Sequence, residues 1–591
     1  MSRIASFLAA GLAATAVTAR PTSERWTRQT SSNTSMIYSF EDLPSSADLE
    51  WTPCYDRFDC ANLEVPLDYA EPDIGTTIIA FIRQEATNGT GHDILFNPGG
   101  PGGSGVDYIL SGGGDKIIEL TGGKNGVVSF DPRGVNNSGI ALTCFPDDPD
   151  ARDAYYSSMN TDLPTLNEDY YQAIALGQWC TQANNGTYAR YAGTSAVVQD
   201  MMHFTELQAA LNGDEKPEES QIWYYGASYG TVIGHTLAML YPDRIGRIVV
   251  DANVNSENWF NGLVRTSVET SDDGYDWFFK LCAEAGLGKC AFAGNSSSGD
   301  DIKKRFDSLL TRLEKAPVVS NDTTSPSGPQ IITKSRVLNV GFGTLYSPVS
   351  QWPLLAAGLY FLEKDNATGW IEVEQALSEP TNPGPFNYTS IAAQETLTFI
   401  TAVDAAGRYP IKDVDDFIKV AGEIEKESVY AGENYVETNI LINAGLKLSP
   451  PKSQYFSGKS SQVKSRPSST HPSDSFLCER KPANDGQKGF KQTNTSTPIL
   501  FINTSADPIT PLASAKHMST YFPGSVVLVQ NSPGHSWTAI GSSCVEGHLA
   551  SYLADATLPK EGTVCETDTK PLVDTKEVAK RSLAVNGHFK R

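Results

Sequence analysis

Residues 221–230 read Gln-Ile-Trp-Tyr-Tyr-Gly-Ala-Ser-Tyr-Gly, and this stretch decides the fold. An apolar run ends in Gly226-Ala-Ser-Tyr-Gly230, and helical spacing over residues 231–241 follows until Pro242 stops it. The pattern predicts a strand, a sharp turn and a helix. A serine on such a turn is forced towards an unfavourable backbone conformation, and flanking glycines let strand and helix approach closely. Ser228 is therefore the candidate nucleophile. The alternative is an ordinary glycine-rich connection between a strand and a helix.

The composition describes a large acidic chain. Its 591 residues can form one large domain with an insertion or several small domains, and 40% of them are hydrophobic. The formal net charge of -23 argues against nucleic acid and anionic membrane surfaces as partners, because both select basic patches. We therefore expect no nucleic-acid partner and no membrane partner.

The first residues have the features of a secretory signal. Arg3 precedes an uncharged apolar stretch from Ile4 to Val17, and Val17-Thr-Ala19 supplies small residues for cleavage. The stretch is too short to span a bilayer. A buried core helix is the alternative, but neither a helical cap nor a polar face is present. These features predict a signal peptide over residues 1–19 and a secreted, extracellular protein.

Glycosylation motifs agree with secretion. Asn-x-Ser/Thr sequons accept N-linked glycans only in a secretory lumen, so we expect glycans on several of them. The ten sequons begin at Asn33, Asn88, Asn136, Asn185, Asn295, Asn321, Asn366, Asn387, Asn494 and Asn503.

Nine cysteines in an oxidising compartment predict disulfides and one unpaired thiol. None of the cysteines has the spacing of zinc ligands, so we expect no metal site and no cofactor. The expected pairs are Cys54–Cys60, Cys282–Cys290, Cys544–Cys565 and Cys144–Cys180, which leaves Cys478 unpaired.

Short apolar runs alternate with helical segments along both ends of the chain. The runs at 93–97, 126–131, 221–227 and 245–251 predict buried strands, and residues 497–503 and 525–530 resume the pattern. Such alternation is typical of a doubly wound, mostly parallel sheet with ligands at the C-terminal ends of its strands. Residues 195–211 are the predicted helix before the nucleophile strand, with Asp200, His203 and Glu206 on its outer side.

The middle of the chain breaks this pattern with helical segments, such as 300–315, 351–363 and 414–428, and a Ser/Pro/Lys-rich loop over 448–475. We interpret it as a mainly helical cap inserted into the α/β core; an independent domain is the alternative. The predicted organisation is a signal peptide (1–19), a flexible leader or pro-segment (20–50), the first part of the core (51–255), the cap (256–492), the second part of the core (493–568) and a C-terminal tail (569–591).

A glycine-rich loop, Asn97-Pro-Gly-Gly-Pro-Gly-Gly-Ser-Gly105, follows the strand at 93–97. Bare backbone N–H groups in such a loop can bind an anion. A phosphate-binding loop would end in Lys and Ser or Thr, which are absent here. The loop instead predicts an oxyanion hole formed by the N–H groups of Gly99 or Gly100 and Tyr229.

Two further candidates complete a catalytic arrangement. Asp507 follows the strand at 497–503 and His535 follows the strand at 525–530, which gives the chain order Ser, Asp, His. His517 and His548 are poorer candidates for the base because they lie on the helices that follow. Asp251 also ends a strand and is the rival acid. Arg133, in the turn after the strand at 126–131, is expected to brace that turn.

Five motifs together resemble the α/β-hydrolase peptidases of the proline iminopeptidase and tripeptidyl aminopeptidase group. They are Asn97–Gly105, Phe130-Asp-Pro-Arg-Gly134, Gly226–Gly230, Ala506-Asp-Pro-Ile-Thr-Pro511 and Gly534-His535. The resemblance covers residues 51–255 and 497–565. It implies Ser228 as nucleophile, His535 as general base, Asp507 as the residue that orients it, and Gly99, Gly100 and Tyr229 as the oxyanion site.

The resemblance also implies a substrate class. Peptidases of this group bind the free amino terminus through acidic residues of the cap, and Glu257 and Asp404 are the candidates here. The first interpretation is a secreted serine exopeptidase that releases amino acids or short peptides from free N-termini. The second is an esterase or amidase that acts on a small metabolite with the same triad. The third is a binding module with an inactive hydrolase fold.

Overall fold

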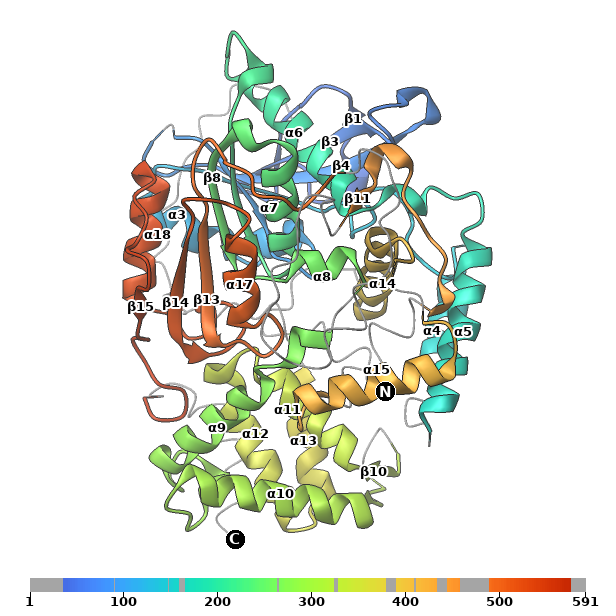
Figure 1. Cartoon of the computed structure of the whole chain (residues 1–591), viewed down its shortest axis with the longest axis vertical. Coiled ribbons are helices and arrows are strands. Elements are labelled where there is room, and N and C mark those ends of the chain that lie inside the picture. The colour runs from blue at the N-terminus through green and yellow to red at the C-terminus, as the bar shows by residue number, and fades with distance from the viewer. Residues whose placement is uncertain are drawn as a thin grey trace.

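The structure is a computed structural model of the chain. It describes residues 36–89, 91–146, 148–158, 165–262, 265–323, 328–378, 389–408, 411–432, 444–457 and 488–574. In this part of the chain, one large sheet with covering helices forms the upper half of the view in Figure 1, and a group of helices forms the lower half.

The main sheet has 11 strands in the order β1-β3-β4-β6-β5-β7-β8-β13-β14-β15, with β2 paired to β3 at one end. All pairs from β6 to β15 are parallel, whereas β3–β4 and β4–β6 are antiparallel. The predicted doubly wound, mostly parallel sheet is therefore confirmed. Its strands are β1 (Ser45–Ser46), β2 (Thr52–Cys54), β3 (Phe58–Pro66), β4 (Thr76–Gln84), β5 (Ile94–Asn97), β6 (Val127–Phe130), β7 (Ile222–Ala227), β8 (Ile245–Asp251), β13 (Leu500–Ala506), β14 (Val526–Pro533) and β15 (Val564–Cys565).

Helices on both faces bury the central strands. Every residue of β5 and β6 is buried, as a parallel sheet covered on two sides requires. The helices nearest the sheet in sequence are α2 (Gly105–Leu110), α3 (Gly113–Leu120), α6 (Thr194–Leu211), α7 (Tyr229–Leu240), α8 (Ser256–Phe260), α17 (Leu512–Ser519) and α18 (Ser543–Asp555).

A buried ion pair joins α6 to the turn after β6. Arg133 and Asp200 are fully buried, and two guanidinium nitrogens each donate a 2.7 Å hydrogen bond to the carboxylate. Arg133 also donates to the carbonyls of Pro66 and Leu67. Arg133 thus braces its turn as predicted, but Asp200 does not lie on the outer side of its helix. Helical periodicity alone missed this, because a buried cation on another segment reverses the usual preference of a carboxylate for water.

Residues 36–50, predicted as part of a flexible leader, belong to the folded core. Phe40 and Leu43 are buried there, and β1 pairs with β3 in parallel. Asn62 donates hydrogen bonds to the carbonyls of both Phe40 and Leu43. The segment is too short and too polar to show periodicity, so its few anchoring side chains gave no signal in the sequence. The predicted signal peptide lies outside the described residues.

The lower helices share a hydrophobic cluster that is separate from the core of the sheet. The insertion contains α9 (Ser271–Ala285), α10 (Gly299–Lys315), α11 (Lys334–Thr344), α12 (Pro348–Glu363), α13 (Ala367–Ser378), α14 (Ser390–Ala405) and α15 (Val414–Glu427), together with a small hairpin of β9 (Val318–Ser320) and β10 (Gln330–Ile332) and the short parallel pair β11 (Phe456–Ser457) and β12 (Lys488–Gly489). The mainly helical character predicted for this insertion agrees with these elements.

The predicted boundaries of the cap need two corrections. Tyr170 and Ala173 of α5 (Leu166–Ala183) pack in the lower cluster, and the ring of Tyr170 lies tilted against that of Phe417. A helix that precedes β7 therefore contributes to the cap. The helix before it in the chain is α4 (Pro149–Ser158). Conversely, α8 and α14 pack in the core of the sheet through Phe260 and Phe399. The cap and core interlock, which argues against an independent domain.

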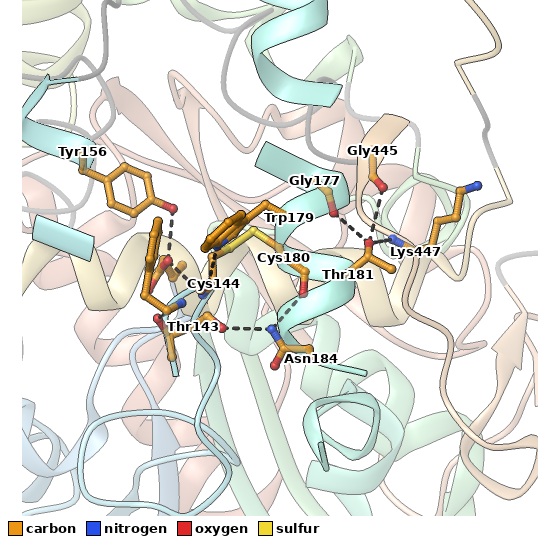
Figure 2. The surroundings of a disulfide bond; sticks show 12 residues. Thr143, Cys144, Tyr156, Gly177, Trp179, Cys180, Thr181, Asn184, Gly445 and Lys447 are labelled. Carbon is orange, nitrogen blue, oxygen red and sulfur yellow. Dashed lines mark hydrogen bonds between the residues drawn. A yellow bond between two sulfur atoms is a disulfide. The ribbon is translucent and has the colours of Figure 1, made fainter. Parts of the chain in front are cut away.

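The four predicted disulfides are all present: Cys54–Cys60, Cys144–Cys180, Cys282–Cys290 and Cys544–Cys565. Figure 2 shows how Cys144–Cys180 ties the loop after β6 to α5. The side-chain amide of Asn184 donates to the carbonyl of Thr143 beside the bridge, so the same contact is made twice. Cys478 lies outside the described residues.

The described part of the predicted C-terminal tail, residues 569–574, packs against the cap. Leu572 is fully buried in the lower cluster. Lys570 forms an ion pair of 2.7 Å with Glu284 of α9. These six residues thus pack against the insertion rather than extending away from it.

Candidate active site

The turn between β7 and α7 has the strained geometry that its sequence predicts. Ser228 has a φ of 55° and a ψ of -123°, a conformation that side chains rarely adopt. A Cβ on Gly226 would lie 2.3 Å from the carbonyl oxygen of Gly230, and one on Gly230 would lie 2.7 Å from that of Asn97. Only glycine fits at either position, so the two glycines permit the turn that exposes Ser228.

His535 and Asp507 meet although they lie on different loops. Asp507 follows β13 and is fully buried, and His535 follows β14 with its side chain 8% exposed. The Nδ1 atom of His535 lies 3.0 Å from each carboxylate oxygen of Asp507. The carboxylate also accepts the backbone N–H of Thr510 at 2.8 Å, which fixes its orientation. Because the carboxylate of Asp507 accepts the hydrogen bond from the Nδ1–H group, Nε2 is the unprotonated, basic nitrogen of the neutral ring.

Two carboxylates act on the titration of His535. Burial lowers the pKa of His535, but the charge of Asp507, its hydrogen bond and the charge of Asp251 outweigh burial, so the pKa is raised above its ordinary value. The ring of Tyr346 packs edge-on against the imidazole with centroids 5.0 Å apart. This contact comes from the linker between α11 and α12, so the cap lies directly on the histidine.

A cavity of about 80 Å³ contains both Ser228 and His535 in its wall. Aromatic side chains from the core line much of it, including Phe96, Tyr225 and Trp537, and Tyr346 of the cap closes one side. The nucleophile candidate and the base candidate thus face one small, largely apolar space. Apolar walls of this kind lower the local dielectric and so strengthen electrostatic interactions at the site.

The predicted oxyanion donors are adjacent, but one of them is already used. A Cβ on Gly99 would lie 2.8 Å from Cβ of Ser228 and 3.1 Å from the amide nitrogen of Tyr229, so the loop passes directly over the turn. The N–H of Gly99 donates to Oδ1 of Asn97 at 3.0 Å, which corrects its predicted role as a donor. In the described chain, no residue accepts from the N–H of Gly100 or Tyr229. These two amides are therefore the remaining candidates.

Neither acidic candidate for substrate binding lines the cavity. Asp404 of α14 is 4% exposed, and its carboxylate accepts from the N–H of Thr194 at 2.8 Å and from the indole of Trp259 at 2.9 Å. Glu257 of α8 accepts at 2.8 Å from both His517 and Tyr521. Asp404 is thus occupied in holding α6, α8 and α14 together, a role that a lone carboxylate in the sequence does not reveal.

The rival catalytic candidates are also located. His517 lies on α17 and bonds Glu257 of α8. His548 lies on α18, next to the Cys544–Cys565 bridge. That histidine and the two cysteines form the one group of potential metal ligands found among the described residues, but the sulfurs are joined in a disulfide and cannot act as thiolates. Asp251 stays close to the site: it lines the cavity and is buried.

Two contributors to the site have no signal in the sequence. Tyr346 lies 189 residues before His535 in a helix linker, and only the folding of the cap brings them together. The hydroxyl of Thr510 lies 3.2 Å from Nδ1 of His535. Its position three residues after Asp507 could have shown that Thr510 is a neighbour of the acid, but not that it is a neighbour of the histidine.

Among the described helices, none is both long and apolar enough to cross a bilayer.

The sheet order, the strained turn after β7 and the paired loops after β13 and β14 define an α/β-hydrolase. Comparison with known sequences agrees. The family model described as "TAP-like protein" matches residues 468–565, which include Asp507 and His535. The serine protease Hip1 of Mycobacterium tuberculosis is 24% identical over 538 residues, covering 88% of this chain and 91% of the relative.

Two further relatives match shorter regions. The tripeptidyl aminopeptidase of Streptomyces lividans is 26% identical over 39% of this chain and 43% of its own length. Carboxylesterase B of Mycobacterium tuberculosis is 32% identical over 24% of this chain and 27% of its own length. Among solved structures, the epoxide hydrolase VrEH1 of Vigna radiata is 12% identical with a TM-score of 0.29, covering 84% of this chain and 98% of its own. The resemblance to TAP-like α/β-hydrolase peptidases is confirmed, and the chain is a serine hydrolase of this fold.

The raised pKa of His535 predicts an acidic limb in the pH profile. The base must be neutral to accept a proton, so kcat/KM should fall about tenfold per pH unit below an apparent pKa above the ordinary 6.5 of histidine. An aryl ester without groups that titrate in this range is the substrate of choice, because a peptide amine would add its own titration. A rate that stays constant from pH 5 to pH 8, with chemistry limiting, would contradict a histidine base.

Replacing the nucleophile candidate should abolish turnover without unfolding the protein. Ser228→Ala removes only the attacking hydroxyl, so kcat should fall by at least about 10⁴-fold while the thermal unfolding midpoint stays close to that of the wild type. Ser551→Ala, at an exposed helical serine, is the matched control and should retain full activity. A folded Ser228→Ala protein with wild-type turnover excludes Ser228 as the nucleophile.

Proposed function

We propose that this protein is a secreted serine exopeptidase that releases amino acids or short peptides from free N-termini. The observation that carries the proposal is the shared cavity: Ser228 and His535 both face it, and Asp507 holds the imidazole from behind. The names of two similar proteins, a serine protease and a tripeptidyl aminopeptidase, support a peptide substrate.

In the proposed acylation step, Ser228 attacks the carbonyl carbon of the scissile bond while Nε2 of His535 takes the hydroxyl proton. Asp507 accepts the hydrogen bond from Nδ1 and stabilises the imidazolium that forms. The tetrahedral oxyanion accepts from the N–H groups of Gly100 and Tyr229. Collapse of the intermediate breaks the C–N bond, His535 returns the proton to the leaving amine, and the N-terminal fragment stays bound to Ser228 as an ester.

In the proposed deacylation step, a water molecule attacks the ester carbonyl and gives one proton to His535. The second tetrahedral intermediate uses the same two amides. Its collapse breaks the bond to the oxygen of Ser228, which regains its proton from His535, and the N-terminal fragment leaves as a carboxylic acid. Each step needs the histidine first as a base and then as an acid, which suits a group that titrates near neutral pH.

The cap gives a physical reason for exopeptidase action. The cavity is about 80 Å³, and Tyr346 lies against the catalytic histidine candidate. A loop of a folded protein would have to enter the cavity as two backbone segments at once, past the contact between Tyr346 and His535. A chain end needs to enter from one side only. The cap therefore favours short peptides with accessible termini over folded proteins.

An esterase acting on a small metabolite is the second candidate. Within the described chain, Asp251 is the one carboxylate in the wall of the cavity, and its oxygens already accept hydrogen bonds from Ser536, Trp537 and Tyr225. The space next to Ser228 thus offers no clear partner for an α-ammonium group. The partial similarity to a protein named carboxylesterase B points the same way.

The N-terminal amine of the substrate decides between the two functions. If a carboxylate of the cap binds the ammonium group, free Ala-Ala-Pro and Pro anilides should react about 30- to 100-fold faster in kcat/KM than their acetylated forms, the size of one charge-assisted contact. Aryl esters without an amine serve as the control for intact chemistry. Equal rates on free and acetylated peptides contradict the aminopeptidase proposal and favour the esterase.

Glu257→Gln and Asp404→Asn then test which carboxylate supplies that contact. The variant that reduces the preference for a free amine, with activity on the aryl ester retained, identifies the binding residue. Because Asp404 holds Thr194 and Trp259, its substitution should also lower the thermal unfolding midpoint. A preference unchanged in both variants assigns the contact to another residue of the cap.

Secretion is the localisation we propose. The four disulfides among the described residues are stable in an oxidising compartment and uncommon in the cytosol. Sequons at six positions are exposed, namely Asn88, Asn185, Asn295, Asn321, Asn366 and Asn494. Two others are not available: Asn503 is fully buried in β13, and the side chain of Asn136 donates to Ser104 and Asp107.

Glycan mapping tests this localisation. After expression in a eukaryotic secretory host, enzymatic release of N-glycans should lower the mass of the secreted protein, and the conversion of Asn to Asp that marks a released glycan should occur among the six exposed sequons. Asn136 and Asn503 serve as internal controls and should stay unmodified. Failure of the native leader to direct secretion contradicts the proposal.

A further inference from the structure

A second buried carboxylate forms hydrogen bonds with the loop that carries His535. Asp251 ends β8 and is 1% exposed. Its Oδ2 atom accepts from the hydroxyl of Ser536 at 2.5 Å, and its Oδ1 atom accepts from the backbone N–H of Trp537 at 3.4 Å. Both donors follow His535 directly in the sequence. Asp251 therefore binds the two residues after the base, while Asp507 binds the base itself.

Ser536 connects the two carboxylates. Its hydroxyl donates to Asp251 and its backbone N–H donates to Oδ2 of Asp507 at 3.3 Å. Its φ of 73° lies in the left-handed region, where a residue with a side chain is strained. Such a conformation persists only where the surroundings hold it, and these two hydrogen bonds supply that restraint. The backbone direction at His535 thus depends on Asp251.

Aromatic residues close this network. The indole N–H of Trp537 donates to the hydroxyl of Tyr225 at 2.9 Å, and that hydroxyl lies 3.3 Å from Oδ2 of Asp251 as a donor. Trp537 and Tyr225 are 1% and 4% exposed. The network therefore runs from Asp251 to Ser536, along the backbone to Trp537, and through Tyr225 back to Asp251. These buried hydrogen bonds, together with the peptide bond between Ser536 and Trp537, leave the four residues little freedom.

The charges near the base are few. Asp507 and Asp251 both favour the imidazolium, and the other groups next to the ring, Thr510 and Tyr346, are neutral. Facing Asp251 are Tyr108 of α2, Tyr225 of β7 and the two residues after His535, and Lys116 of α3 lies in the wall of the same cavity. Burial raises the pKa of Asp251 to about 6, against the hydrogen bond from Ser536 and the charge of His535.

We propose that Asp251 is a positioning residue of the active site: through Ser536 and Trp537 it fixes the loop that carries His535, and its charge stabilises the imidazolium formed during turnover. The inference rests on the proposed role of His535 as the general base. The hydrogen bonds that the structure gives Asp251 are to Tyr225, Ser536 and Trp537, not to the imidazole itself. The contribution of Asp251 is to hold the base in place and to add a second negative charge beside it.

Asp251→Asn separates this role from ordinary packing, because it keeps the shape of the side chain and removes the charge. We expect kcat on an aryl ester to fall by about 10- to 100-fold, KM to change by less than about twofold, and the acidic limb of kcat/KM to move to lower pH by about half a unit to one unit. The limb moves down because a base with one fewer neighbouring anion loses its proton at lower pH. Asp243→Asn, at an exposed carboxylate, is the matched control and should leave the limb in place.

Two variants at Ser536 isolate the anchoring bond from the charge. Both variants lose the hydrogen bond from the Ser536 hydroxyl to Asp251. In Ser536→Ala the positive φ is still strained, whereas glycine in Ser536→Gly adopts that φ without strain. Both should lower kcat, with alanine the more damaging residue, and the acidic limb should move less than in Asp251→Asn, because the carboxylate of Asp251 is retained. These variants also carry the test if Asp251→Asn fails to fold.

Titration with a fluorophosphonate measures the fraction of active sites in each preparation and corrects kcat for misfolded protein. The proposal is overturned if Asp251→Asn, corrected in this way, keeps wild-type kcat, or if its acidic limb does not move. Failure of the proposed function is a different result: the wild type would not be labelled at Ser228, or Ser228→Ala would turn over substrate. An Asp507→Asn variant should lose more activity than Asp251→Asn, because Asp507 contacts the imidazole directly.

Discussion

The close approach of three backbone segments around Ser228 is the constraint on which the rest of the site depends. Glycines at 99, 226 and 230 leave no room for a Cβ, so the glycine-rich loop over residues 97–105, the end of β7 and the start of α7 come together at one point. The strain at Ser228 persists because these neighbours fix the turn from several sides. Ser228 then lies where the parallel strands end, and His535, on the loop after β14, lines the same cavity.

The second requirement is a firmly held histidine, and the chain meets it with buried charge. Asp507 bonds the imidazole and Asp251 bonds the residues that follow it, so two adjacent strand ends support one loop. Buried carboxylates are costly unless hydrogen bonds satisfy them, and both carboxylates accept several. The same arrangement appears away from the site, where Asp200 satisfies the buried Arg133. In both places a costly buried charge specifies where a loop must lie.

The insertion takes part in the site through Tyr346 and through α14. Tyr346 packs on His535, Ala393 of α14 lies against Gly102 of the glycine-rich loop, and Asp404 of the same helix binds Thr194 at the start of α6. The hydroxyl of Thr194 lies 2.7 Å from that of Tyr229, the residue after Ser228. Packing of the insertion is thereby coupled to the position of the glycine-rich loop and of the strained turn.

The sequence alone determined what depends on local pattern and order along the chain. The strand, turn and helix around Ser228, the positions of Asp507 and His535 at strand ends, the parallel sheet and the four disulfide pairs all follow from spacing over a few tens of residues. The tertiary structure decided which groups are already occupied. The N–H of Gly99 donates to the side chain of Asn97. Asp404 accepts from Thr194, 210 residues away, and Asp251 accepts from Ser536, 285 residues away. The physical reason is that periodicity and turn chemistry are local properties, whereas the partner of a buried polar group depends on which distant segments pack together.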